Sequence, residues 1–371
     1  MGNCIKPPSN TRRYQASATG SPAHSSPART SLSHASRSEG LSSRGGNSPA
    51  YAPPPRVYLG THPAHLRYGG NHPLEPHEIQ QAAYHLAAYA VGDEVTSPRR
   101  LAAAGQTVHD VRALLKHGRG NVQADNAPSG GQNQIGSSVA KMAADATSMI
   151  ATAVAMGAAV CDQIAPLVGI VHAPHMAPNE RSETVGGTVH LHEITNAGYA
   201  VPTRTGHTWN ELRRQSDGRH GKSTIVMEAW GNGPAVRLQD SAWSRTPIEE
   251  QVWAFDKDDA GRMKSRLEGL VPLVHPDNDP FTEKKLNRIL RDPVQWEQFV
   301  EPQVVSGEFA DRARAALSNM HTGEQRATAS RVIQDTYGME PGTDEHQHAV
   351  ESVVATAYQL DALHRSAPVV P

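Results

Sequence analysis

The chain has 371 residues, with 35 Lys and Arg against 37 Asp and Glu, so its formal net charge near pH 7 is −2. This balance indicates no nucleic acid as a partner. Two cysteines cannot form the disulfide framework of a small secreted domain, and no run reaches the roughly 18 apolar residues of a membrane-spanning helix.

Residues 1–55 are predicted to form a disordered tail. The first 50 residues contain 12 Ser, five Pro and five Gly, and Glu39 is their only acidic residue. Such a segment buries too little apolar surface to offset the entropy cost of folding. The composition suits a type III secretion signal, and a flexible linker would have it too.

The chain begins MGNCIK, which predicts a lipid anchor. Once Met1 is removed, Gly2 is an acceptor for a myristoyl chain and Cys4 for a palmitoyl chain. One myristoyl chain binds a membrane only marginally, whereas two lipid chains hold a protein there stably. Lys6 departs from the motif, which has Ser or Thr at this position.

Residues 56–135 are predicted to be a mainly helical region. Ile79, Ala82, Leu86 and Tyr89 recur at steps of three and four residues, and helical spacing continues to about residue 117. The segment GRGNVQADNAPSGGQNQ at 118–134 has the composition of a loop.

Residues 136–275 are predicted to combine helix and strand. A helical stretch runs up to Cys161, TVHLHEI at 188–194 alternates like a strand, and STIVMEAW at 223–230 is typical of a buried strand. Residues 276–371 form a helical region, in which LNRIL, WEQFV, ADRARAAL and AVESVVATAYQLDALH have apolar residues at helical spacing. The fold class predicted from these elements is α+β.

Cys161 is the candidate nucleophile. A reactive thiol needs a base within hydrogen-bond reach and a third group that orients the base. If His207 and Glu228 lie on adjacent antiparallel strands, they can present an imidazole to a thiol on a helix. A cysteine in an alanine-rich stretch is also often just a small buried hydrophobic residue.

Four blocks of the sequence resemble the AvrPphE/HopX/XopE type III effectors of plant-pathogenic bacteria. They are RALLKHGRGNVQAD (112–125), AMGAAVCDQIAPLVGIVHA (155–173), GHTWNE (206–211) and IVMEAWGNGPAVRLQDS (225–241), and they occur in the order of that family. The resemblance covers roughly residues 110–245.

This resemblance implies a transglutaminase-like, papain-related core with a Cys-His-acid triad at Cys161, His207 and Glu228. It also implies a region that binds a host target or cofactor, around Gly118, Arg119, Gly120 and Asn121. Trp209 and Trp230 each lie two residues beyond a triad residue, and we expect them to form pocket walls or core.

The chain departs from the family around the triad. Glu228 replaces an aspartate, and Val160, Asp162 and Gln163 replace the residues that flank the family's cysteine. A carboxylate at Asp162 disfavours a thiolate beside it. Pro166 conflicts with a helix that begins at Cys161, so such a helix either starts later or is kinked.

The function predicted is that of a secreted effector that forms a thioester with a host plant protein at the plasma membrane. Transglutaminase, deamidase and protease activity remain open, because the acceptor decides between them. The alternative is a catalytically inactive, membrane-tethered scaffold that binds a host protein. A third interpretation is a plain cytosolic bacterial protein, and it applies only if the N-terminus is never acylated or secreted.

The other motifs indicate no further chemistry. In HAPH, a proline separates His172 and His175, and in HLHE the side chains of His190 and His192 alternate along a strand. Neither is the helical pair of a zinc protease, so we expect no metal and no cofactor. GNGPA at 231–235 is neither a P-loop nor a dinucleotide fingerprint and predicts a turn.

Overall fold

The computed structural model describes residues 57–61, 68–70, 72–93, 95, 97–219 and 221–360. The predicted tail up to residue 55, with Gly2 and Cys4, lies outside these residues. The described part combines an antiparallel sheet with many helices, so the α+β class is confirmed. None of its helices is both long and apolar enough to cross a membrane.

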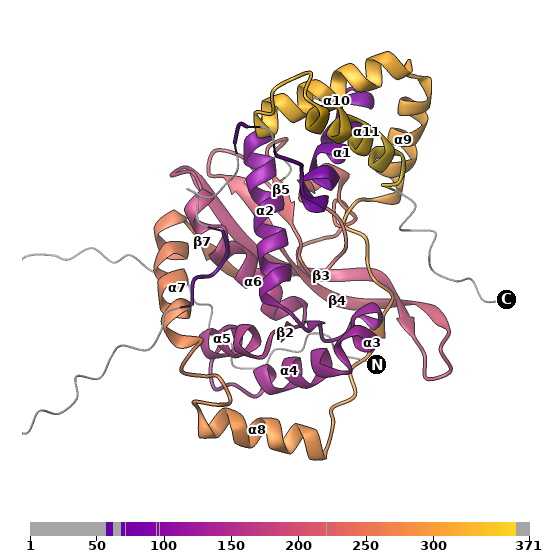
Figure 1. Cartoon of the computed structure of the whole chain (residues 1–371). Coiled ribbons are helices and arrows are strands. Elements are labelled where there is room, and N and C mark those ends of the chain that lie inside the picture. Colours follow the sequence, from indigo (N-terminus) through magenta and orange to yellow (C-terminus); the bar gives the residue numbers. More distant parts are fainter. Residues whose placement is uncertain are drawn as a thin grey trace, which may run out of the picture.

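The sheet is built around one long hairpin. β3 (Glu180–Ile194) and β4 (Ala200–Arg214) pair over their whole length, and Figure 1 shows their far end extending beyond the helices. The strand order is β6-β5-β4-β3-β7, and β8 pairs with the far end of β3. These strands are β5 (Ile225–Met227), β6 (Val236–Arg237), β7 (Glu250–Phe255) and β8 (Gln298–Phe299).

Helix α6 (Cys161–Val171) is the central helix of the fold. Every residue of α6 except Asp162 is buried, because the helix packs on β4 and β3 while α2, α5 and α7 surround it. A helix that is apolar on all sides belongs in a core. The surrounding helices are α2 (Pro98–Leu114), α5 (Ala146–Met156) and α7 (Lys257–Leu270).

A second helical group lies at one end of the molecule. There α1 packs against α9, α10 and α11, which Figure 1 shows in indigo and yellow at the top. Buried side chains such as Leu86, Ile333 and Val353 form a core of their own in this group. The helices are α1 (Pro76–Ala90), α9 (Gly307–Asn319), α10 (Thr322–Tyr337) and α11 (Asp344–Tyr358).

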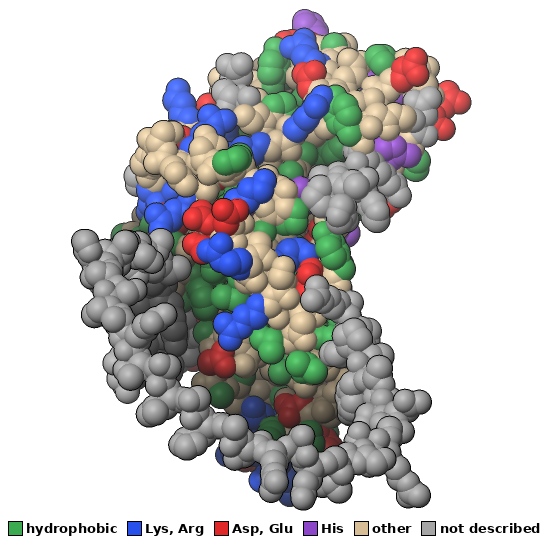
Figure 2. Space-filling model, turned by 90° about the vertical axis from the view of Figure 1, so that its left-hand side faces the viewer, with side chains coloured by type: hydrophobic (Ala, Val, Ile, Leu, Met, Phe, Trp, Pro, Cys, Tyr) green, Lys and Arg blue, Asp and Glu red, His purple; other side chains and the backbone are tan. Residues whose placement is uncertain are grey.

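Short elements follow α2 at the opposite end. α4 packs against α5 and α8, and β1 pairs in parallel with β2 immediately before α6. The elements are β1 (Gly118–Arg119), a 3-10 turn (Gln123–Asp125), α3 (Asn126–Ser129), α4 (Gln132–Lys141), β2 (Ala158–Ala159) and α8 (Pro280–Arg291). On the face in Figure 2, basic and acidic side chains are intermixed, in line with the balanced total charge.

The predicted regions 56–135, 136–275 and 276–371 share one core. Its largest cluster contains Val108 from the first region, Ile164 from the second and Phe309 from the third. The hydrophobic contacts therefore cross both boundaries, and the division into domains stays a prediction.

Three local predictions were wrong. The 118–134 segment is not a plain loop, since it contains β1, α3 and the start of α4. The helical stretch before Cys161 is two helices, because Asp145 caps α5 by accepting hydrogen bonds from the backbone of Thr147 and Ser148. WEQFV is not helical: it contains β8, where Phe299 pairs with Glu193.

Candidate active site

Cys161 is the first residue of α6. Val160 precedes it in an extended conformation, and the backbone N–H of Val160 donates a hydrogen bond of 2.9 Å to the side-chain carbonyl of Gln163. The helix therefore does not start later than Cys161. Pro166 lies inside α6 and has no N–H to donate to the carbonyl of Asp162. The positive end of a helix dipole favours a thiolate at this position.

His207 and Glu228 form a buried hydrogen-bonded pair. His207 lies in the middle of β4, opposite Gly187 of β3, and Glu228 directly follows β5, which is the antiparallel neighbour of β4. Nε2 of His207 lies 3.0 Å from Oε2 of Glu228. The other oxygen, Oε1, accepts a hydrogen bond of 2.7 Å from the backbone N–H of Trp230. Both carboxylate oxygens thus hold defined partners.

The thiol of Cys161 reaches the imidazole of His207. A hydrogen bond between the two side chains contributes to the pKa of His207. Nδ1 of His207 is buried and has no hydrogen-bond partner among the described residues, so it is the imidazole nitrogen that is available to the thiol. The structure therefore brings Cys161, His207 and Glu228 together, and their catalytic role stays a prediction.

The electrostatics of the pair favour a protonated imidazole. Burial acts to lower the pKa of His207, but the Glu228 carboxylate and Cys161 raise it more, to about 9. Since an imidazolium stabilises a thiolate beside it, His207 is charged appropriately for a nucleophilic Cys161 at neutral pH.

Three tryptophans enclose the imidazole of His207. The ring centroids of Trp230 and Trp243 lie 4.7 Å from it and that of Trp209 lies 5.9 Å away. Aromatic faces at this distance attract a cation. Trp209 and Trp230 are fully buried and donate to Glu211 and Asn121, so both form walls of the site; their role in target binding stays a prediction.

Trp243 is the residue that the sequence reasoning missed. It follows the WGNGPA block by several residues, and no local periodicity links it to His207. Its indole Nε1 is buried without a hydrogen-bond partner in the described part of the chain, and so is Nε2 of Gln163. Buried donors of this kind are rare. Trp243 lies beside His207 and Gln163 lies two residues after Cys161, so both unpaired donors belong to the surroundings of the candidate site.

Asp162 does not leave an uncompensated negative charge beside the thiol. Lys141, at the end of α4, forms an ion pair with Asp162. The ammonium group offsets the carboxylate, so the negative charge next to Cys161 is matched by a cation from another helix. Sequence reasoning could not find this pairing, because Lys141 lies in a separate helix.

The GRGN block lies beside the candidate nucleophile. Gly118 and Arg119 pair with Ala158 and Ala159, and the N–H of Gly120 donates to the carbonyl of Ala159, two residues before Cys161. A Cβ on Gly120 would come within 2.2 Å of the Ser137 hydroxyl, so only glycine fits.

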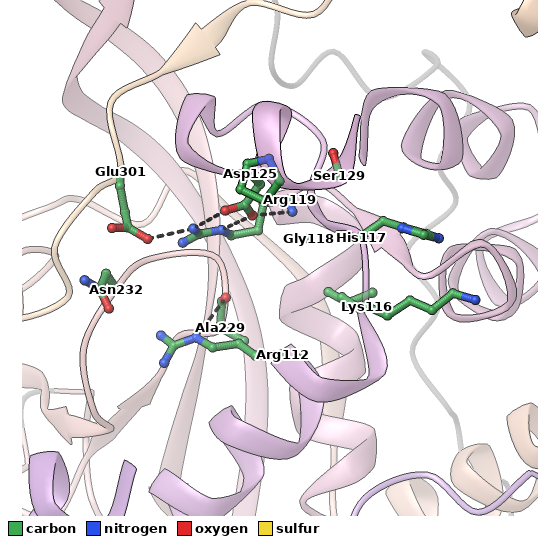
Figure 3. A pocket seen from close by; sticks show the side chains of 12 residues that line it. Arg112, Lys116, His117, Gly118, Arg119, Asp125, Ser129, Ala229, Asn232 and Glu301 are labelled. Atoms are coloured by element: carbon green, nitrogen blue, oxygen red, sulfur yellow. Dashed lines mark hydrogen bonds and ion pairs between the residues drawn. The ribbon is translucent and has the colours of Figure 1, made fainter. Parts of the chain in front are cut away.

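Two arginines hold the loop that carries Glu228 (Figure 3). Arg112 donates to the carbonyls of Glu228 at 3.2 Å and of Gly233 at 3.0 Å, and Arg119 donates to the carbonyl of Trp230 at 2.9 Å. The predicted target-binding role of Gly118, Arg119, Gly120 and Asn121 stays a prediction. In the structure Gly118 and Arg119 pair with β2, which leads to Cys161, and the side chain of Asn121 accepts a hydrogen bond from the indole of Trp230.

The described residues contain no group of three or more histidine, cysteine or acidic side chains with the geometry of a metal site. His172 instead shares a hydrogen bond of 2.8 Å with the hydroxyl of Thr107 in the core. Comparison with known proteins yields no matching family model, no matching curated protein and no matching solved structure.

Proposed function

We propose that this chain is a cysteine-dependent acyltransferase or hydrolase with a transglutaminase-like core. Cys161 would be the nucleophile, His207 the general base and acid, and Glu228 the residue that orients and charges the imidazole. One observation carries the proposal. Cys161, at the start of the central helix, contacts the buried imidazole of His207, which in turn forms a hydrogen bond with Glu228.

The reaction would begin with attack of the thiolate on the carbonyl carbon of a carboxamide or peptide bond. The oxyanion would be stabilised by the buried N–H groups near the start of α6. His207 would donate its proton to the departing amine, leaving a thioester on Cys161. Water would then release an acid, and an amine would instead form a new amide.

A second part of the proposal concerns where the protein acts and on what. It is based on the four sequence blocks, which occur in the same order as in the effector family. We propose that the protein acts as a type III effector on a host plant protein at the plasma membrane, held there by acylation of Gly2 and Cys4. Both residues lie outside the described part of the chain, so this part of the proposal is supported by the sequence resemblance.

A Gly2→Ala variant tests the lipid anchor. In plant cells the original chain should fractionate with the plasma membrane, whereas Gly2→Ala should be soluble, because one remaining acyl site cannot hold a protein stably on a membrane. The measurement is the membrane fraction by immunoblot, with Gly20→Ala as a matched control in the same tail. Equal membrane binding of both variants would contradict the anchor.

The reactivity of the thiol tests the triad. We expect iodoacetamide to alkylate Cys161 with a half-maximal rate well below pH 8.5, the usual value for a thiol, because His207 is cationic up to about pH 9. In His207→Gln the profile should move up towards 8.5. The rate is measured against pH on protein in which Cys4 is replaced by serine, and His190→Ala, on the exposed part of β3, is the control.

One observation favours the alternative function, an inactive scaffold. Cys161 is only 2 % exposed, so a substrate reaches it only if neighbouring side chains move. An alkylation profile that His207→Gln leaves unchanged, or a thiol that never reacts in the folded protein, would support the scaffold and sink the enzymatic proposal.

A further inference from the structure

Helix α8 lies at the outer edge of the fold. Figure 1 shows it at the end of the molecule opposite α9, α10 and α11, and its main contact is with α4. Thr282 and Ile289 are its buried residues, so one side of the helix packs on the fold and the other side faces outward. The outward side is therefore available to a partner.

The cations of α8 are gathered on one side of the helix. There are four of them: Lys284, Lys285, Arg288 and Arg291. A helix turns by about 100° per residue, so their side chains, together with Phe281, fall within about a third of its circumference. Glu283 is the only acidic residue of α8, and it falls outside this third. We call the surface made of Phe281 and the four cations the α8 face.

The α8 face carries an excess of positive charge. None of its four cations forms an ion pair with a residue that the structure describes. Asp279 precedes the helix, and its carboxylate accepts hydrogen bonds from backbone N–H groups of the first turn. Asp277 lies 3.5 Å from His275, and Asp292 follows the helix. The four cations therefore exceed the two carboxylates, Asp279 and Asp292, that directly flank the helix.

Large apolar side chains are exposed in the same segment. Phe281 is 76 % exposed, the largest fraction for any large apolar residue in the described part of the chain. Leu273, Leu290 and Val294 are exposed as well. Single exposed apolar residues are normal on a protein surface, but four within residues 273–294, beside unpaired cations, indicate an interaction surface.

We propose that the α8 face docks on a membrane surface that contains anionic lipids. Lys and Arg side chains are attracted to the negatively charged headgroups, and an aromatic ring beside them enters the boundary between the headgroups and the acyl chains. A helix at the edge of the fold can lie along a flat lipid surface without a groove. This docking needs neither the proposed acyl chains nor the proposed reaction of Cys161, and it would add to the affinity of a lipid anchor.

Co-sedimentation with lipid vesicles tests the proposal. The full-length chain is produced without acyl chains, which mass spectrometry checks. One set of vesicles is pure phosphatidylcholine, and the other contains about one quarter phosphatidylserine. We expect the chain to sediment only with the second set, and binding to fall as sodium chloride is added, because salt screens exposed charges. No sedimentation with the second set, or equal sedimentation with both, would overturn the proposal.

A triple variant, Lys284→Gln/Arg288→Gln/Arg291→Gln, locates the binding. All three side chains are exposed, so the fold is kept, and denaturant titration should show unchanged stability. We expect binding to the phosphatidylserine vesicles to weaken about tenfold or more.

The matched control removes three exposed cations elsewhere, in Lys222→Gln/Arg312→Gln/Arg331→Gln, and should bind like the original chain. If the two triple variants bound equally, the vesicles would be attracted by the N-terminal tail or by the total charge, and the proposal would fall.

Phe281→Ser tests whether lipid, rather than any polyanion, is the partner. Its ring is exposed and makes little packing contact, so the fold is kept while the apolar contribution is lost. We expect binding to the phosphatidylserine vesicles to weaken about threefold or more. Unchanged binding would show that the cations alone attract the vesicles, as they would an acidic protein, and would overturn docking of the α8 face on a membrane.

Discussion

Under the proposed function, replacing Cys161 with alanine should abolish the effect of the protein on a host cell. Without the thiol no thioester can form, and loss of a nucleophile from a catalytic triad lowers turnover by about a thousandfold or more. The readout is the response of plant tissue that expresses each variant at equal level, checked by immunoblot. The expected response to Cys161→Ala is that of tissue that does not express the protein.

Two controls separate lost chemistry from lost structure. Cys161 is small and buried, so alanine should cost only about 1 kcal/mol of unfolding free energy, measured by denaturant titration. Cys161→Ser keeps a hydrogen-bonding group next to His207 but is a much weaker nucleophile. It should fold normally and be equally inactive. A full host response from a well-expressed Cys161→Ala would remove the enzymatic proposal.

Replacing Glu228 with alanine should destabilise the protein by about 3–5 kcal/mol, the usual effect of removing one partner of a buried ion pair. The change leaves His207 buried without its carboxylate and removes the acceptor for the N–H of Trp230. The measurement is the free energy of unfolding at pH 7 from a denaturant titration.

The pH dependence identifies the cause of that loss. The pKa of His207 is about 9 in the folded protein against 6.5 for a free imidazole, so the folded state binds the proton more tightly. This contribution is fully present below pH 6.5 and is lost as the pH rises through 9. Stability of the original protein should therefore fall over this range, and the fall should be absent in Glu228→Ala.

Matched variants make the Glu228 result specific. Glu228→Gln keeps the volume and an oxygen for the N–H of Trp230 but removes the charge, so its loss should be smaller than that of alanine. Glu340→Ala removes an exposed carboxylate and should change stability by no more than about 0.5 kcal/mol. Equal stability of Glu228→Ala and the original protein between pH 6 and 10 would contradict the ion pair with His207.

The sequence located most helices, because an apolar face repeats every three or four residues along one element. α1, α2, α8, α9 and α11 lie where this spacing predicted helices. It failed where tertiary contacts override local preference. WEQFV has helical spacing, but Phe299 is held by strand pairing with β3 and by packing on Trp230.

The resemblance of four blocks named Cys161, His207 and Glu228, and the structure brings these three residues together. It could not reveal the partners that other elements supply. Trp243 beside the imidazole and Lys141 beside Asp162 come from segments without a recognisable motif.

The sequence by itself thus determined the class of fold, most of the helices and the residue types at the candidate site. Only the tertiary structure decided the charges around them. It gave His207 a raised pKa through a buried carboxylate, held the loop of Glu228 with Arg112 and Arg119, and placed the GRGN block beside the strand that leads to Cys161. Periodicity reports contacts within one element, whereas these properties depend on distances between segments that are up to about a hundred residues apart in the chain and meet only when the core packs.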